Sequence, residues 1–134
     1  HKNALSHFHA IILCTNKPEE TIARCCWLTN QSSPRRIFGS SWQVGLDQQK
    51  IIVCSEEDVE RIVPSVNVSN LPSILGYALL TESLSKTKDC FSHNELVLQS
   101  LNQGSFLVKL PEFISGNLII GTSAADFPWN GDFN

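Results

Sequence analysis

The fold of this 134-residue sequence is constrained most strongly by its short apolar runs. They are spread along the whole chain and are separated by turns and helix-start patterns. Phe8–Cys14, Ser105–Leu110 and Asn117–Gly121 have the length and composition typical of buried strands. Ile37–Val44 and Lys50–Cys54 are separated by a five-residue stretch that contains glycine, which is typical of a hairpin. The runs fall early, in the middle and late, so a sheet must pair strands that are far apart in sequence.

A helix is predicted directly after the first of these runs. Pro18, followed by two glutamates, predicts a helix to about Leu28, because proline suits the first helical turn and carboxylates are stabilised at its positive end. The side chains that we expect to face inward are Ile22, Cys25, Cys26 and Leu28.

Three further segments carry helical patterns. Ser55–Asp58 resembles a capping box and predicts a short helix that ends before Pro64. Ser73–Ser85 is apolar on nearly every side and therefore predicts a central, buried helix. Ser92–Glu95 is a second capping box, and the segment after it forms either a short helix through Leu101 or a strand.

Together these elements predict an α+β fold with a mixed or antiparallel sheet of about five strands and roughly two to four helices. We expect residues 1–121 to form a single compact domain. Residues 122–134 have no periodic pattern and are expected to form a C-terminal tail.

The cysteines constrain the compartment. Five is an odd number, and no Cys-x-x-Cys spacing occurs, so we expect free thiols in a reducing, intracellular compartment, cytoplasmic or nuclear. Cys14 and Cys54 end apolar runs and are expected in the core, whereas Cys90 is expected to be accessible in a loop. The alternative is a secreted, glycosylated binding domain, because Asn30 and Asn67 each begin an Asn-x-Ser sequon.

The charge content excludes some classes of partner and favours another. Charged residues make up only 17% of the chain and the formal net charge is −3, so nucleic acid is an improbable partner and no apolar run is long enough for a membrane span. Low charge predicts that part of the surface is covered in a working assembly. The chain starts at His1 and contains no Met, which we interpret as a processed product or a piece of a larger protein.

The sharpest chemical pattern is His7-Phe8-His9. On a strand both imidazoles point to one side, where they could hold one metal ion. The pattern resembles the His-hydrophobe-His strand of the HUH nucleases, a family of rolling-circle replication and relaxase enzymes. That resemblance implies a divalent metal at His7 and His9, and Tyr77 on its predicted helix as the nucleophile that attacks a DNA phosphodiester.

A winged-helix domain is another alternative. Ser73–Ser85, Ser92–Leu101 and a strand pair over Ser105–Gly121 have the order helix, helix, wing. His93–Gln103 contains no Lys or Arg, whereas helices that recognise DNA are usually basic. A winged helix here would therefore bind protein.

Aromatic residues are concentrated in the tail. Phe127, Trp129 and Phe133 lie close together, and large aromatic side chains contribute strongly to binding when they enter a partner's pocket. The tail either binds a protein partner through these three residues or packs back on its own domain.

No nucleophile motif, P-loop or dinucleotide-binding fingerprint occurs in the sequence. The sequence therefore favours a non-catalytic protein–protein interaction or assembly domain, without a cofactor, taken from a larger intracellular protein. The metal-dependent nuclease remains the catalytic alternative.

Overall fold

The computed structural model describes residues 4–64, 66, 68, 70–102, 104–111 and 116–130. Its strands form one mixed sheet in the order β2-β3-β4-β1-β5-β8-β7-β6. The strands are β1 (Leu5–Cys14), β2 (Arg35–Phe38), β3 (Ser41–Leu46), β4 (Gln49–Cys54), β5 (Ser73–Thr81), β6 (Val97–Asn102), β7 (Ser105–Lys109) and β8 (Asn117–Gly121). The predicted α+β class is confirmed, but the prediction of about five strands is wrong, because the sheet has eight.

The described residues group into two compact units, and β1 and β5 each pass from one into the other. Residues 10–75 form what we call the α1 unit. Residues 4–9 and 76–130, apart from the gaps given above, form the α3 unit. Each unit has its own helix and its own apolar cluster and is described by itself.

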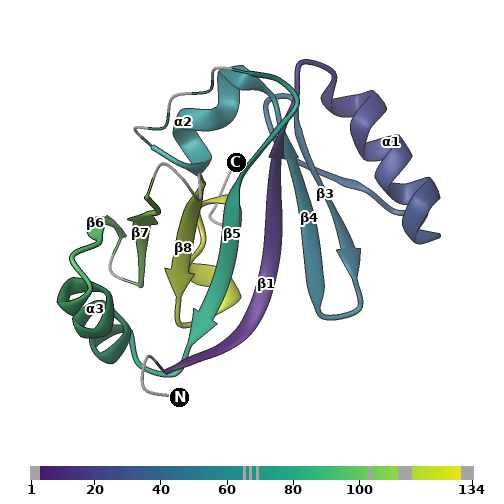
Figure 1. Cartoon of the computed structure of the whole chain (residues 1–134). Helices are drawn as coiled ribbons and strands as arrows, with labels where there is room; N and C mark the ends of the chain where they lie inside the picture. The colour runs from purple at the N-terminus through teal and green to yellow at the C-terminus, as the bar shows by residue number, and fades with distance from the viewer. Residues whose placement is uncertain are drawn as a thin grey trace. The chain divides into compact units, whose positions relative to one another are not determined.

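Helix α1 (Pro18–Thr29) covers one face of the sheet in the α1 unit (Figure 1). Here β1 pairs in parallel with β4, which pairs antiparallel with β3. Ile22 packs with Val44 and Val53, and this cluster is bordered by partly buried Leu13, Cys25, Cys26, Trp42 and Ile51. The predicted helix is confirmed, with proline in its first turn. Asn30 ends it in a left-handed conformation, and its N–H contacts the carbonyls of the last turn.

The predicted hairpin is confirmed between β3 and β4, but its first arm is two strands rather than one. The segment 37–44 is broken after Phe38 by a turn at Gly39 and Ser40, where Gly39 has a φ of 47°. A positive φ costs little for glycine and much more for residues with a Cβ. The chain therefore folds back there, and β2 pairs antiparallel with β3.

A short helical segment follows β4, as predicted. It consists of the 3-10 turn η1 (Glu56–Asp58) and helix α2 (Val59–Ile62), which ends before Pro64. Val59 and Ile62 are buried. Asp58 is buried as well, and its carboxylate accepts hydrogen bonds from Ser40 and Ser41 at the turn between β2 and β3.

The α3 unit contains the predicted strand pair β7 and β8, which is antiparallel, together with β5, which is parallel to β8. Helix α3 (Leu84–His93) borders this sheet beside β6 and β7 (Figure 1). Phe106, Val108 and Ile120 form the buried cluster, to which Leu84 and Phe91 of α3 add partly buried contacts.

The predicted helix over Ser73–Ser85 is wrong. Ser73–Thr81 is strand β5, which lies between β1 and β8 in the sheet. A segment that is apolar on every side of a helix is equally apolar on both faces of a central strand, so the pattern alone does not separate the two. Gly76 supports the strand, because a Cβ at this position would collide with the backbone carbonyl of Asn117 on β8.

The helix begins later, where a loop was predicted. The Ser83 side chain accepts a hydrogen bond of 3.3 Å from the Lys86 N–H and starts α3. Cys90 therefore lies on a helix, half-buried, and not in an exposed loop. Of the two alternatives left open after Ser92–Glu95, the strand is the one observed, as β6. The winged-helix alternative is wrong, because its first helix is a strand.

Candidate functional site around helix α1

The two histidines and the tyrosine of the nuclease hypothesis lie on strands of the α3 unit. Tyr77 is on β5, half-buried, with its ring 6.0 Å from that of Phe8. His7 is exposed, whereas His9 is buried with its ring stacked 5.0 Å from Phe127. The helix-borne tyrosine that the HUH resemblance implied is therefore absent from the described part of the chain. Among the described residues, no group of three His, Cys, Asp or Glu side chains is placed to hold a metal ion.

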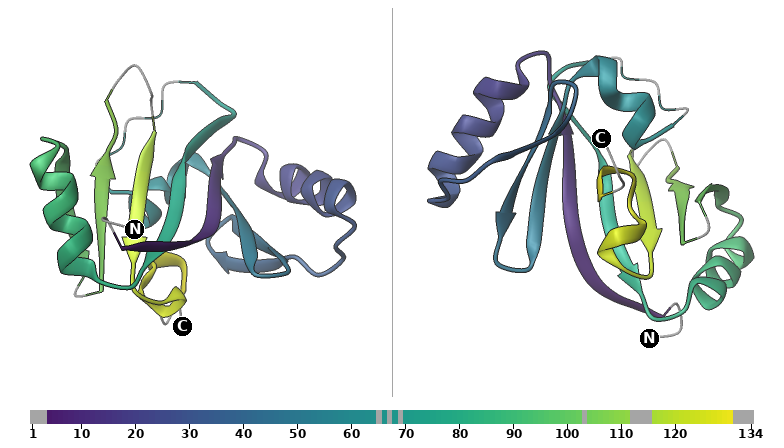
Figure 2. Two further views of the ribbon diagram at one scale, coloured as in Figure 1. Left: turned by 60° about the horizontal axis from the view of Figure 1, so that its bottom comes forward. Right: turned by 180° about the vertical axis from the view of Figure 1, so that it is seen from behind.

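Two of the three aromatic residues predicted to bind a partner through the tail are buried in the structure, and the third lies outside the described residues. Phe127 and Trp129 are each 1% exposed, and their rings stack at 5.0 Å, so that His9, Phe127 and Trp129 form a continuous stack. Figure 2 shows the segment that carries Phe127 and Trp129 against β8. A Cβ on Gly121 of that strand would lie 3.1 Å from the Phe127 ring. Phe133 lies outside the described residues. In this conformation Phe127 and Trp129 offer no surface to a partner.

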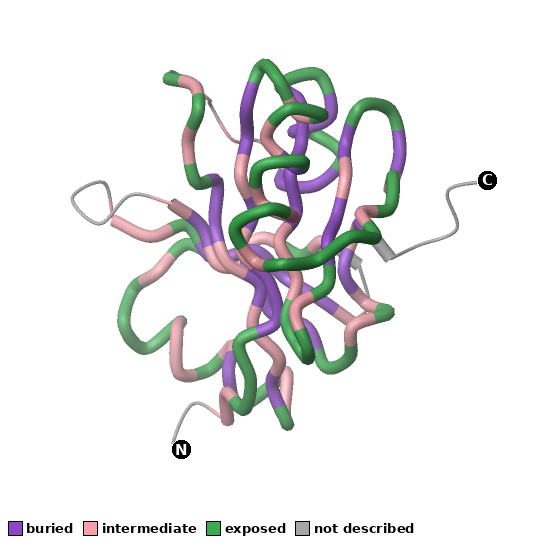
Figure 3. Tube along the Cα trace, turned by 90° about the vertical axis from the view of Figure 1, so that its right-hand side faces the viewer, coloured by how far each residue is buried: buried purple, intermediate pink, exposed green. Residues whose placement is uncertain are grey.

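Among the described residues, the most exposed large apolar side chains lie on the outer side of α1. Trp27 is 80% exposed and its neighbour Leu28 is 74% exposed. The prediction that Leu28 faces inward is therefore wrong. Figure 3 shows exposed residues along the side of α1 that faces away from the sheet. The sequence did contain a signal, since Trp27 is five residues from buried Ile22 and five residues place it on the opposite side of a helix.

The outer side of α1 also carries charge near its start. Glu20, Ala23 and Arg24 are exposed, and Glu20 lies about two turns before Trp27, so both share one face. The last turn contains no basic residue. The outer surface of α1, defined by Glu20, Ala23, Arg24, Trp27 and Leu28, thus runs from an acidic start to an apolar end.

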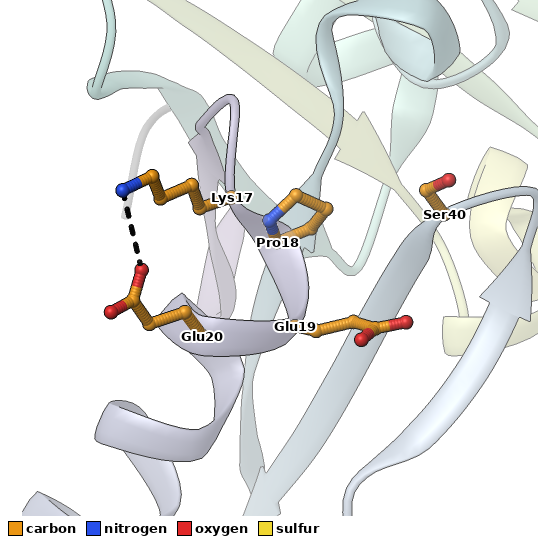
Figure 4. A pocket seen from close by; sticks show the side chains of 5 residues that line it. All are labelled: Lys17, Pro18, Glu19, Glu20 and Ser40. Atoms are coloured by element: carbon orange, nitrogen blue, oxygen red, sulfur yellow. Dashed lines mark ion pairs between the residues drawn. The ribbon is translucent and has the colours of Figure 1, made fainter.

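An open cavity of about 410 Å³ lies at the start of α1 (Figure 4). Its lining residues are Lys17, Pro18, Glu19, Glu20 and Ser40. Lys17 and Glu20 form an ion pair of 3.9 Å, and Glu19 pairs with Arg36 of β2 at 3.7 Å. These side chains are more than half exposed, so each pair contributes at most about 1 kcal/mol to stability.

A second cavity of about 260 Å³ shares Pro18 and Ser40 with the first and adds two more carboxylates, Glu56 and Glu57. It lies where β1 and β4 end side by side, since parallel strands finish at the same edge. The lining of the second cavity contains two carboxylates and no basic side chain, so this cavity suits a cationic group better than an anion.

All five cysteines are free thiols, as predicted, and Cys14 and Cys54 are fully buried. Cys25 and Cys26 lie on α1, partly buried against the sheet. Burial, followed by its neighbour Cys26, raises the pKa of Cys25 above its usual range. The Cys25 thiol therefore has little nucleophilic character at neutral pH.

The first sequon lies at the end of α1. Asn30 is exposed there, while Asn67 of the second sequon lies outside the described residues. No helix among the described residues is both long and apolar enough to cross a membrane.

No protein-family model matches the chain, and no curated protein matches it either. Two solved structures from mobile metagenomes, the first of them an integron cassette protein, align with most of it. One, from the mobile metagenome of V. cholerae, is 12% identical, with 86% of this chain and 93% of that chain covered and a TM-score of 0.37. The other, from V. pseudocholerae, is also 12% identical, covers 86% and 92%, and has a TM-score of 0.32. Similarity at this level carries no argument about function.

Proposed function

We propose that this chain is a non-catalytic protein-binding domain that contacts its partner through the outer surface of α1. The exposure of two adjacent large apolar side chains, Trp27 and Leu28, carries the proposal. Tryptophan is the residue type most enriched among those that dominate binding energy at protein interfaces. Leaving both side chains in water has no benefit for the folded state of the isolated domain.

The surface indicates the chemistry of the partner. An exposed helix that presents one apolar end commonly binds by laying that face into an apolar groove. Glu20, at the start of the outer surface of α1, favours a basic side chain at that end of the groove. The partner is therefore a protein with an apolar groove and a basic rim. A reducing intracellular compartment, which suits five free thiols, belongs to the same proposal.

The test compares capture of proteins by the full-length chain and by two matched variants. The paired substitution Trp27→Ser with Leu28→Ser removes the proposed contact. Val97→Ser is the control, because Val97 is also a large exposed apolar residue, 63% exposed, but lies on β6 in the other unit. We expect the first variant to lose partners that the wild-type chain and the control retain. Equal circular dichroism spectra would establish that all three chains are folded.

A second arm tests the basic rim. Glu20→Lys reverses a charge at the start of the outer surface without changing Trp27 or Leu28. We expect weaker capture at low salt and a smaller difference from wild type at high salt, because salt screens exposed charges. Partners captured equally by wild type and by the Trp27/Leu28 variant would overturn the proposal.

A further inference from the structure

Cys14 and Cys54 lie directly opposite each other on neighbouring strands. In the parallel pairing of β1 with β4 they are register partners, at the last rung of the ladder. Neighbouring strands are about 4.8 Å apart, and disulfides join Cα atoms that are roughly 4.4–6.8 Å apart. Paired residues of a parallel ladder point to the same face of the sheet. The backbone therefore places these two thiols at a separation that a disulfide can span.

The two side chains already contact each other through a hydrogen bond. Burial is the main cause that raises the pKa of each thiol. The hydrogen bond lowers the pKa of Cys14 and raises that of Cys54, which is the pattern expected when the Cys54 S–H donates to the Cys14 sulfur. The pKa of both thiols is raised, so both are mostly protonated at neutral pH.

Cys14 borders a cavity in the described part of the α1 unit. Cys14 forms part of the wall of an apolar cavity of about 260 Å³, together with Leu13, Pro72 and Ile74. Cys54 is not among the lining residues. A water molecule occupies about 30 Å³ in the liquid, so the cavity has room for a molecule of the size of hydrogen peroxide. Both thiols are completely buried, which excludes larger reagents.

We propose that Cys14 and Cys54 form a reversible, peroxide-dependent disulfide in which Cys14 reacts first and Cys54 closes the bridge. The Cys14 thiolate attacks one peroxide oxygen: an S–O bond forms, the O–O bond breaks, and the departing hydroxide takes up a proton. Cys54 then attacks the sulfenic sulfur: an S–S bond forms, the S–O bond breaks, and the S–H proton of Cys54 leaves with the hydroxide as water. Two thiols and one hydrogen peroxide give one disulfide and two water molecules.

The bridge has a consequence for the α1 unit. It joins β1 to β4 covalently and closes a loop that contains α1, β2 and β3. Closing a loop of this length restricts the unfolded chain and stabilises the folded one. The oxidised chain is therefore more stable than the reduced chain, and a dithiol reductant reverses the difference.

The experiment treats the full-length, reduced chain with hydrogen peroxide and follows intact mass and peptide maps. We expect a product lighter by two hydrogen atoms, a linked peptide pair containing Cys14 and Cys54, and a higher melting temperature that dithiothreitol reverses. In Cys54→Ser the reaction stops at a Cys14 sulfenic acid, which dimedone traps. In Cys14→Ser neither a bridge nor a trapped Cys54 forms.

Cys90 provides the matched control, because it is a half-buried thiol on α3 in the other unit. Cys90→Ser should form the Cys14–Cys54 bridge at the wild-type rate. A bridge that instead involves Cys25, Cys26 or Cys90 overturns the proposal. The proposal is also overturned if both thiols persist after peroxide has oxidised Cys90 completely. Overoxidation of Cys14 without a bridge would overturn it as well.

Discussion

The carboxylate of Asp58 accepts a hydrogen bond of 2.6 Å from the hydroxyl of Ser41, and both side chains are buried. The same carboxylate oxygen accepts a second hydrogen bond of 3.0 Å from the Ser40 N–H. A Cβ on Gly39 would lie 2.6 Å from its other oxygen. One carboxylate thus holds the turn between β2 and β3 against the helical segment after β4, beside the cavities at the start of α1.

Asp58→Ala is expected to destabilise the chain by about 2–4 kcal/mol, because it leaves a buried hydroxyl and a backbone N–H without their charged acceptor. Urea denaturation measures the loss. Asp58→Asn keeps one acceptor oxygen and should cost less. If Asp58→Ala unfolds at the wild-type denaturant concentration, the two hydrogen bonds do not contribute to stability.

Gly39→Ala is expected to cost about 1–2 kcal/mol from the positive φ alone, and more from the contact with Asp58. The contact disappears when Asp58 is already alanine. The two substitutions should therefore be less than additive in a double-mutant cycle. Strict additivity would show that Gly39 is required for its backbone conformation only.

Trp129→Ala is expected to destabilise the chain by about 3–5 kcal/mol, since it empties a fully buried site next to Phe127. Trp27→Ala is the matched control. It removes the same side chain from an exposed position and should change stability by no more than about 0.5 kcal/mol. Thermal unfolding of both variants compares them directly, and equal losses would contradict the assigned burial.

Gly76→Ala is expected to cost about 1–3 kcal/mol, because the added methyl group meets the backbone carbonyl of Asn117 and forces β5 away from β8. Gly45 is also a strand glycine, but a Cβ there meets no atom within 4 Å. Gly45→Ala should therefore be neutral or slightly stabilising. Comparing the denaturant midpoint of each variant with that of the wild type tests both predictions.

Asp126 supplies a pH-dependent contribution. Hydrogen bonds, the first from Thr122 at 2.7 Å and others from Ser123, hold the pKa of its carboxyl below the usual value. A carboxyl with a lowered pKa in the folded state stabilises the fold above the unfolded pKa of about 3.9, and this stabilisation disappears as pH falls through the folded pKa. The stability difference between wild type and Asp126→Asn should be largest near neutral pH and shrink in acid.

Thr122→Val checks the cause of this shift, because it removes the first of those donors. An NMR titration of the Asp126 carboxyl should then give a pKa closer to the ordinary value. An unchanged pKa would mean that the Ser123 contacts are sufficient.

Local sequence signals predicted several elements correctly. Helix α1, the β3–β4 hairpin, the short helix after β4 and the β7–β8 pair each have their own start or turn residues, and those residues act within a few positions along the chain. The exposed position of Trp27 could also have been read from helical spacing. The surface that the proposed function uses is therefore encoded locally, in α1.

The assignment of β5 as a strand required the tertiary structure. Its apolar pattern is compatible with a buried helix and with a central strand, and pairing with β8, far along the chain, selects the strand. The tail residues Phe127 and Trp129 are a second case, because their burial depends on where Gly121 and His9 lie.

By itself the sequence determined an α+β chain with free cysteines and placed Cys14 and Cys54 in the core, since both end apolar runs. Only the tertiary structure decided that the two thiols face each other. The register of a parallel pair is set by contacts between distant segments, and a shift of one residue would turn either side chain to the opposite face.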